Sequence, residues 1–533
     1  MRFYMLSRRT FLTQLLVAML TVTALIGVAG QARAQSTEFR QAVADAVASD
    51  RELVSFYQAR NFAGIWNDRG RRNAVLAAYA AAGDHGLPVN RYNAQPLFDQ
   101  LGGNTTAAQG RAEAELSRMF LQYARDIQTG VLTPSRVDSN INRQIPYRSR
   151  LATIQAFAQS NAAGFLRTLP PAAPEYGRLM QQKAALERLL ADGGWGPTAG
   201  NRKLEQGSSG AAVVALRDRL IAMGFLARTN TQVFDATMMS AVQQFQLAHG
   251  LNPDGAAGPA TLAEINTDPG RRLQAVIVAM ERERWLNRPR GLRHIWVNLT
   301  DFSAQIIDND QVTFETRTVV GAAARDRYSP EFSDVMEFMV INPSWYVPRS
   351  IMTKEYLPLL QNDPNSVRNL IITDVRGQRI DRSAVDFNEY SETNFPFDMR
   401  EPPSQGNALG LVKFMFPNPY NIYLHDTPAK RLFGREVRAF SHGCIRLADP
   451  FDFAYALLAP QVSDPEGFFR ARLRTGTEQR VNLADPVPVH LVYRTAFTRP
   501  EGRMQYRRDV YGRDARIWRA LAREGVAVRA VRG

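Results

Sequence analysis

The spacing of apolar residues changes part way along this chain of 533 residues. Residues 112–127 and 175–194 place apolar side chains at the spacing of amphipathic helices. Beyond residue 293, short runs rich in Val, Ile, Thr and Phe alternate with turn-prone stretches, which is typical of strands. A chain of this length also exceeds what one hydrophobic core usually serves. The sequence therefore predicts a multidomain α+β protein.

Gly- and Pro-rich stretches mark the expected domain boundaries. We expect a helical domain at residues 36–200 and a compact helical unit at 204–266, in which glycines separate amphipathic segments. A mostly-β domain follows at 271–497, and residues 498–533 form a basic C-terminal tail that contains a helix. The chain thus has two helical units before its β-rich part.

A proline-rich, polar stretch at about residues 343–410 interrupts the β-rich domain. Only the piece TKEYLPLL (353–360) reads as helix, so the sequence predicts an irregular insertion. Long irregular insertions in compact domains are usually functional and often act as lids. We therefore expect this segment to form a lid over the functional site.

The first 34 residues have the features of a secretory signal peptide. The arginine pair in SRRTFL precedes an apolar run, and the triplet ARA at 32–34 is a small-x-small cleavage signal. The pair resembles a Tat signal, whereas in a Sec signal adjacent arginines would occur by chance. No later stretch reaches the ~18 apolar residues of a spanning helix. We expect a protein of the periplasm or cell envelope without a membrane span after cleavage.

The net charge of +14 favours anionic partners. Nucleic acid and an acidic cell envelope are both partners of this kind. Because the leader predicts export, we expect an envelope partner and no nucleic acid.

Cys444 is the only cysteine of the chain. Exported proteins usually pair their cysteines, and this one has no intrachain partner. It is therefore either a small buried hydrophobe or a reactive thiol. His425 precedes it at a distance that lets two neighbouring strands place imidazole and thiol side by side. The residues expected around Cys444 therefore favour a reactive thiol.

A cysteine nucleophile needs a base and donors for an oxyanion. His442 would project from the same face of a strand as Cys444. Gly443 lets the backbone turn closely, so that the N–H groups of residues 443 and 444 can point at a substrate oxygen. Arg446 adds positive charge that would lower the thiol pKa or hold a carboxylate.

The strings FSHGCIRL (440–447) and YLHDT (423–427) resemble the catalytic motif of the YkuD-type L,D-transpeptidases. MERERWL, VINPSWYVPRSI, VPVHLVYRTAF and DVYGRD look like the large multidomain members of this family, and FYQARNFAGIWND and HGLPVNRY resemble their helical scaffold domain. AVxxFQxxxGLxxDGxxGxxTL (241–262) resembles the three-helix peptidoglycan-binding module. RYSPEF stands where close relatives often have Thr-Pro-Val-Phe, and we expect no loss of chemistry from it.

The resemblance implies a helical scaffold, a three-helix peptidoglycan-binding module and a mostly-β YkuD-type catalytic domain with an inserted lid. By the family pattern Cys444 is the nucleophile and His425 the general base, with its ring held by the backbone carbonyl of Asp426. Residues that would support the site or line its cleft are Ser441, His442, Gly443, Arg446, Tyr423 and Trp345.

The implied reaction is acyl transfer in two steps. Cys444 attacks the third-residue carbonyl of a donor tetrapeptide stem and expels D-alanine, and the thioester passes to the side-chain amine of a diamino acid on a second stem. A 3→3 cross-link in peptidoglycan results. The implied partners are peptidoglycan, through its stem peptides and glycan, and carbapenem-type inhibitors that acylate the cysteine. No metal or organic cofactor is implied.

Three other functions could use these residues. A zinc site of His425, His442 and Cys444 lacks a further acidic ligand and the usual local spacing. An L,D-carboxypeptidase or other hydrolase of the same fold would form the same thioester and release it to water, which the sequence does not exclude. A non-catalytic wall-binding protein would not need this intact set of reactive residues. The module at 204–266 either binds the wall or only spaces the domains.

Overall fold

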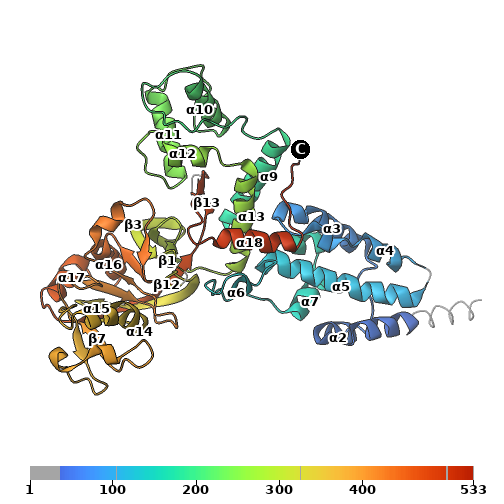
Figure 1. The fold of residues 1–533 in the computed structure, drawn as a ribbon. Helices are drawn as coiled ribbons and strands as arrows, with labels where there is room; N and C mark the ends of the chain where they lie inside the picture. Colours follow the sequence, from blue (N-terminus) through green and yellow to red (C-terminus); the bar gives the residue numbers. More distant parts are fainter. Residues whose placement is uncertain (1–36, 104, 325, 500–501, 532–533) are drawn as a thin grey trace, which may run out of the picture.

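The computed structural model describes residues 37–103, 105–324, 326–499 and 502–531, so the expected signal peptide at 1–34 lies outside the described residues. Figure 1 shows a helical body, a small helical module above it and a β-rich lobe beside it. Across the described ranges, no helix is long and apolar enough to cross a membrane.

The helical body is built around α5, the long helix whose side chains form the middle of its core. Trp66, Phe120 and Phe157 are fully buried there; Phe120 stacks on Phe157, and Trp66 lies edge-on to Phe120. Glu113 of α5 is buried too, and its carboxylate accepts from the Tyr57 hydroxyl at 2.9 Å. The α-helices of this body are α2 (Arg51–Gln58), α3 (Arg69–Ala80), α4 (Gln95–Leu101), α5 (Thr106–Thr129), α6 (Pro134–Val137), α7 (Arg150–Gln159) and α8 (Ala162–Arg167).

The small module has a core of its own, in which Leu216, Val242 and Phe245 are fully buried. The apolar spacing of its sequence therefore reflects packing between its helices. These helices are α10 (Ala211–Ala222), α11 (Ala236–Ala248) and α12 (Pro259–Ile265), as the sequence led us to expect.

Three further helices join the helical body to the β-rich lobe. They are α9 (Pro174–Ala191), α13 (Pro269–Trp285) and α18 (Arg513–Arg523). The sequence places the segment of α13 at the start of the catalytic domain, but this helix packs against α9 and α18. The expected C-terminal tail supplies α18, whose Ile517 and Leu521 are fully buried in the same core.

Buried ion pairs connect α13 to the β-rich lobe. Arg282 pairs with Glu331 at 2.6 Å and with Asp514 at 2.8 Å, and all three side chains are nearly inaccessible. Removing one partner of such a pair typically costs about 3–5 kcal/mol, because the other charge stays buried without compensation. This network thus holds the scaffold and the β-rich lobe in one arrangement.

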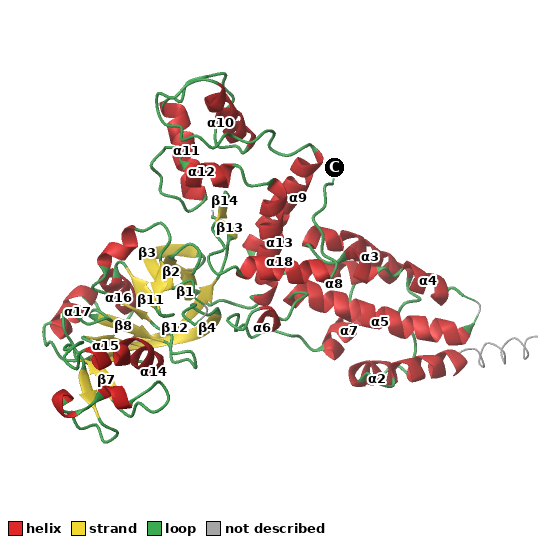
Figure 2. Ribbon diagram, in the orientation of Figure 1, coloured by secondary structure: helices red, strands yellow, loops and turns green. Residues whose placement is uncertain are grey.

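The β-rich lobe contains a nine-stranded sheet in the order β10-β3-β11-β9-β8-β4-β12-β1-β2. Because β2 also pairs with β3, the sheet closes on itself. Its core is completed by α16 (Pro450–Leu458) and α17 (Pro465–Leu473), which Figure 2 shows beside the strands. The strands are β1 (Arg293–Asn298), β2 (Ser303–Asp308), β3 (Gln311–Gly321), β4 (Phe332–Ile341), β8 (Val412–Met415), β9 (Leu424–His425), β10 (Ala439–Ser441), β11 (Ile445–Leu447) and β12 (Gln479–Val492).

The insertion at 343–410 is folded, and the prediction of an irregular stretch is wrong. Its core buries Leu360, Phe387 and Phe395. Leu360 lies in the piece that the sequence predicts as helix, but Phe387 and Phe395 are far from it in sequence, so no local periodicity joins the three into one core. Its elements are β5 (Trp345–Tyr346), α14 (Arg349–Ile351), π-helix η3 (Met352–Tyr356), α15 (Leu357–Asn362), β6 (Ile371–Thr373) and β7 (Asp398–Glu401), with the strands in the order β5-β7-β6.

Candidate active site

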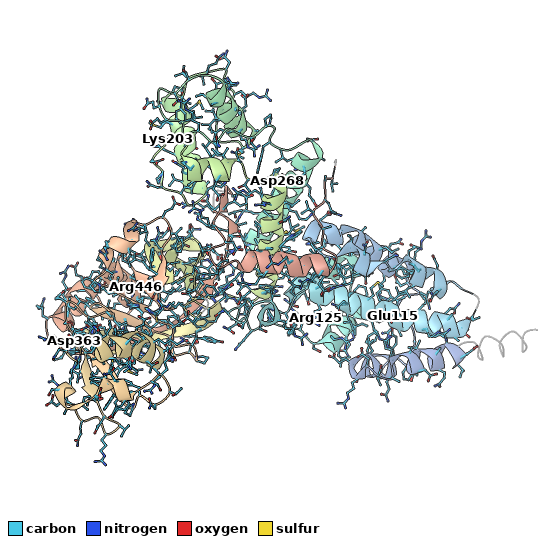
Figure 3. All side chains as sticks on the ribbon, viewed as in Figure 1. Glu115, Arg125, Lys203, Asp268, Asp363 and Arg446 are labelled. Carbon is cyan, nitrogen blue, oxygen red and sulfur yellow. The ribbon has the colours of Figure 1, made fainter. Side chains whose placement is uncertain are left out.

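The neighbouring parallel strands β9 and β11 bring the predicted residues together. Ile445 lies opposite Leu424, and Arg446 lies opposite His425. Leu424 and Ile445 are fully buried in the core of the lobe. Because side chains alternate between the faces of a sheet, His425 and Arg446 lie on the other face. Figure 3 marks Arg446 within this lobe.

Cys444 and Tyr423 directly precede these two strands. The N–H of Ile445 donates to the Tyr423 carbonyl at 3.0 Å, which extends the pairing by one residue. The thiol therefore lies next to Tyr423, on the side of the sheet that holds His425. The Tyr423 ring in turn lies edge-on to the His425 ring, with centroids 5.7 Å apart.

The imidazole of His425 is buried, and its Nδ1–H donates to the Asp426 carbonyl at 2.5 Å. Burial lowers the pKa of His425 to about 3, and the positive charge of Arg446 acts in the same direction; the carbonyls of Asp426 and Leu409 oppose both. The ring is thus neutral near pH 7. Because the proton sits on Nδ1, Nε2 keeps a lone pair that can accept a proton.

The carboxylate of Asp426 fixes the carbonyl that holds this ring. It accepts from the N–H of Leu411 at 2.9 Å and from Nζ of Lys430 at 2.7 Å. Gly410 has φ +62°, and a Cβ at this position would collide with the carboxylate. The glycine at the end of the insertion is therefore needed for the close approach of Asp426.

The thiol of Cys444 is half-buried and donates to the Asn421 carbonyl at 3.5 Å. Burial raises its pKa to about 11, while the N–H and hydroxyl of Tyr423 and the charge of Arg446 pull it down. Arg446 thus acts in the predicted direction, but burial outweighs it, and the resting thiol is protonated. Within the described residues no hydrogen bond joins the thiol to His425, and such contacts often tighten only with substrate.

Tyr423 and Trp345 connect the thiol to the insertion. The Tyr423 side chain packs against the core of the lobe and against that of the insertion. Burial, and the neighbouring Cys444, raise the pKa of Tyr423 well above its ordinary value. Trp345 stands on β5 and packs edge-on against Tyr356 of η3, with ring centroids 6.2 Å apart. The insertion therefore reaches the surroundings of the thiol through Tyr423.

His442 does not lie on a strand, and the prediction that it shares a strand face with Cys444 is wrong. Residues 442–444 form a bend between β10 and β11, because Gly443 has φ +115°. His442 is exposed, and its Nε2 lies 2.6 Å from Oε1 of Glu355 in η3. The same carboxylate oxygen accepts from Arg327 at 2.9 Å.

The bend leaves main-chain donors available beside the thiol. The Ser329 hydroxyl donates to the Gly443 carbonyl at 2.6 Å and so fixes the peptide. In the part of the chain that the structure describes, the N–H groups of Gly443 and Cys444 donate to no other group. Ser441 is buried on β10, and its carbonyl accepts from the N–H of Ala322 at 2.7 Å.

Sequence reasoning missed three residues of this region: Lys413, Glu355 and Ser329. Lys413 is the single charged residue in the run LVKFMF (411–416), which is a signal for an outward-facing functional cation. Glu355 and Ser329 reach the site only through the tertiary fold, so nothing in their local sequence marks them.

No group of three or more His, Cys, Asp or Glu side chains among the described residues is arranged to hold a metal ion. His442 faces Glu355 instead of joining His425 and Cys444. The geometry therefore gives the zinc alternative no support.

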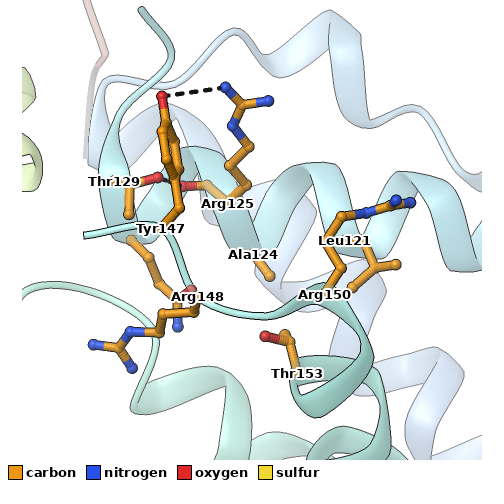
Figure 4. Close-up of a pocket in the computed structure, with 9 residues that line it drawn as sticks. Leu121, Ala124, Arg125, Thr129, Tyr147, Arg148, Arg150 and Thr153 are labelled. Carbon is orange, nitrogen blue, oxygen red and sulfur yellow. Dashed lines mark hydrogen bonds between the residues drawn. The ribbon is translucent and has the colours of Figure 1, made fainter. Parts of the chain in front are cut away.

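Of two cavities in the described residues, one lies near the candidate site and the other lies away from it. One of about 370 Å³ borders Gly410, Asp426 and Asp449, next to the residue whose carbonyl holds the imidazole. Another, of about 270 Å³, lies in the helical body between α5 and the start of α7, where Tyr147 and Arg125 stand at its rim (Figure 4). None of the candidate catalytic residues lines this second cavity.

Three family models match the chain. They are "L,D-transpeptidase catalytic domain" at residues 292–488, "Putative peptidoglycan binding domain" at 209–265 and "Scaffold domain" at 51–182. The first of these ranges contains the pairing of β9 with β11 and therefore both His425 and Cys444.

A Haemophilus influenzae protein named "Putative L,D-transpeptidase" is 30% identical over 246 residues, which is 45% of this chain and 48% of that protein. The chain thus matches about half the length of this curated relative. Solved L,D-transpeptidases from Xylanimonas cellulosilytica and Stackebrandtia nassauensis are 15% and 12% identical; each match covers 56% of this chain and 100% or 97% of the other. Their TM-scores are 0.16 and 0.22, too low to support a detailed comparison.

Proposed function

We propose that this chain, which belongs to the L,D-transpeptidase family and carries a YkuD-type catalytic domain, forms 3→3 cross-links in peptidoglycan by cysteine acyl transfer. The observation that carries this proposal is the pairing of β9 with β11, which sets the Cys444 thiol beside a neutral, oriented imidazole. General-base activation requires the base within hydrogen-bond reach of the thiol, and the strand pairing keeps both groups on one face of the sheet, where substrate can bring them together.

The first step forms a thioester. As Sγ of Cys444 attacks the carbonyl carbon of the third stem residue, Nε2 of His425 takes the thiol proton. The negative charge moves to the carbonyl oxygen, where the N–H groups of Gly443 and Cys444 are placed to receive it. The intermediate collapses with cleavage of the C–N bond, and the imidazolium returns its proton to the departing amine of D-alanine.

The second step transfers the acyl group. The side-chain amine of a diamino acid on another stem attacks the thioester carbon, and His425 accepts a proton from this amine. Collapse breaks the C–S bond and forms an amide, and the sulfur regains its proton from the imidazolium. The donor has lost D-alanine, and the two stems are joined through their third residues.

The surroundings of the site support transfer over hydrolysis. His425 is only 3% exposed, and the insertion supplies Trp345 and Glu355 around the thiol and its loop. Exclusion of water by a covering segment protects a thioester from hydrolysis. We therefore assign the insertion the role of a lid, and the L,D-carboxypeptidase is the second candidate that the product analysis must separate.

The matched domains also support the partner and the place of action. A peptidoglycan-binding domain beside a transpeptidase domain fits a polymeric wall substrate in the cell envelope, the compartment that the leader sequence predicts. Carbapenem-type inhibitors fit the same mechanism, because an acylated Cys444 would gain the mass of one inhibitor molecule. An unmodified intact mass after incubation with excess carbapenem would argue against this site.

The test is mass analysis of the products from a purified disaccharide-tetrapeptide. Transpeptidation yields a dimer whose mass is that of two monomers less one D-alanine and no added water. A carboxypeptidase yields only the tripeptide monomer. Cys444→Ala should retain its thermal transition and form neither product. Cross-links formed at the normal rate by this variant would exclude Cys444 as the nucleophile.

A further inference from the structure

Two cations flank the imidazole in one row across the sheet. Lys413 of β8 lies opposite His425, which lies opposite Arg446, and the row ends on Val340 and Val319. In the next row Phe414 pairs with Leu424 and faces the core. The three polar side chains therefore share the face on which the thiol stands.

Neither cation has a carboxylate partner within the described ranges. Nζ of Lys413 donates only to the Ser344 carbonyl, at 3.4 Å. Nε of Arg446 is buried and donates to nothing there. Burial lowers the pKa of both groups. The carboxylate that acts on Lys413 is Glu478, but this residue receives the N–H of Ser344 and forms no ion pair with the lysine.

Two buried cations elsewhere in the described chain meet carboxylates: Arg282 meets both Glu331 and Asp514, and Lys183 meets Glu187 at 2.8 Å. A third, Arg219, is buried on backbone carbonyls, which accept several of its hydrogen bonds. A cation removed from water without a counter-charge is unfavourable. Two such cations on either side of a catalytic imidazole therefore mark a place where the ligand supplies the negative charge.

We propose that Lys413 and Arg446 form a carboxylate-binding subsite that holds a carboxylate of the donor stem next to the scissile bond. This inference rests on the proposed function, because it takes the donor stem as substrate. Near its scissile bond such a stem offers two carboxylates: that on the side chain of a diaminodicarboxylic acid at position three, and that of the terminal D-alanine. Both have the same chemistry, and substrate analogues separate them.

With Lys413 as a ligand, the subsite would distinguish donor stems by the charge of the recognised group. A carboxylate held between two donors gains charge-assisted hydrogen bonds, whereas an amide at the same place leaves a half-buried cation unpaired. Donor stems with an amidated or neutral group at the recognised position should therefore bind more weakly than stems that carry the free acid.

The experiment compares Lys413→Met, Lys413→Arg and Lys354→Met on three tetrapeptide stems: the free acid, the side-chain amide and the terminal amide. Lys354 is an exposed lysine of the insertion, so its substitution is a control for charge alone. Lys413→Met should raise KM for the free acid at least about tenfold with a much smaller change in kcat. Lys413→Arg should restore most of the loss, and Lys354→Met should change little.

The amide that abolishes the difference between wild type and Lys413→Met identifies the recognised carboxylate. An equal KM loss on all three stems would overturn the subsite. Thermal unfolding without substrate gives a second criterion: removal of a half-buried charge that has no counter-charge should leave Tm unchanged or raise it. A large fall in Tm would show that Lys413 has a structural partner and would also overturn the inference.

Binding in the Cys444→Ala background separates this inference from the proposed reaction. Calorimetry with the free-acid stem requires no turnover, so the dependence of Kd on Lys413 can be measured even if the transfer reaction is absent. Loss of charge dependence in binding would refute the subsite alone. Absence of cross-linked product with normal charge-dependent binding would refute the proposed reaction alone.

Discussion

Glu355 and His442 lie 2.6 Å apart, from Oε1 to Nε2, although 87 positions separate them in the chain. Glu355 belongs to the π-helix of the insertion, and His442 belongs to the bend that ends in the nucleophile. This contact fastens the insertion to the loop that carries Cys444. Both side chains are about one-third exposed, so the bond can open without unfolding either segment.

The first prediction concerns this contact. Glu355→Ala and His442→Ala should each lower the cross-linking rate modestly and raise the fraction of hydrolysed tripeptide, because either one releases the insertion from the loop. Since both remove one interaction, the double variant should be little worse than each single variant. His425→Ala should instead lose about 10²–10⁴-fold, the usual contribution of a general base. Product ratios and rates of the four variants provide the measurement.

A fatal His442→Ala together with a mild His425→Ala would reverse the roles assigned to the two histidines. Fully additive losses for Glu355 and His442 would show that they act independently. A hydrolysed fraction that stays constant in all variants would argue against the insertion as a lid.

The second prediction follows from the thiol. Because burial raises the pKa of Cys444 to about 11, the thiol is protonated at neutral pH, and the reactive thiolate fraction rises about tenfold per pH unit below that value. Alkylation by iodoacetamide, followed by intact mass, should be slow at pH 7 and accelerate steadily to at least pH 9. The chain has a single cysteine, so every label reports this site. Fast labelling that does not change between pH 6 and pH 9 would show a preformed thiolate–imidazolium pair.

The third prediction concerns Gly410. Gly410→Ala combines a positive φ with a collision against the Asp426 carboxylate, so it should shift the carbonyl that orients His425. Backbone strain alone should lower the free energy of unfolding by about 1–3 kcal/mol. We expect the loss of activity to be much larger than this loss of stability would explain. Gly377→Ala is the matched control: Gly377 also has a positive φ within the insertion, but a Cβ there meets nothing within 4 Å. Equal effects of both substitutions on activity would remove the special role of Gly410.

How far the sequence predicts this site depends on whether the relevant information is local. The neighbourhood of Cys444 and His425 follows from a short motif on adjacent strands, and the structure pairs those strands. The side-chain direction of His442 does not follow from strand alternation, because the positive φ of Gly443 interrupts the strand just before the cysteine. Local periodicity fails where a single glycine redirects the chain.

Tertiary contacts account for the other differences. Phe387 and Phe395 meet the predicted helical piece around Leu360 only when the insertion folds, so no local period shows this core. Helix α13 directly precedes the first strand in sequence, which predicts that it belongs to the β-rich domain. Its buried face packs instead against α9 and α18. The position of Lys413 beside His425 depends on the pairing of β8 with β9, which the local sequence does not specify.

The last prediction concerns the small module, which contacts the C-terminal segment and the β-rich lobe. The His249 ring stacks on Tyr506, with centroids 5.5 Å apart. Arg507 donates to the Ala248 carbonyl at 3.0 Å, and the N–H of Asn252 donates to Glu436 at 3.2 Å. Such a module can bind the wall, and it can also support the lobe through these contacts.

Replacing residues 204–266 by a flexible linker separates these roles. A tethered wall site raises the effective concentration of stems at the active site, a benefit that exists only for a polymeric substrate. A smaller fraction of the variant than of the wild type should therefore pellet with insoluble sacculi. Its reaction rate should fall below that of the wild type more strongly on sacculi than on soluble stems. Moderate salt is needed, because the basic chain binds anionic polymers without the module. Equal losses on both substrates would identify the module as a structural spacer, because the lost contacts of Tyr506 and Arg507 affect every substrate alike. No loss on either substrate would show that the module is dispensable.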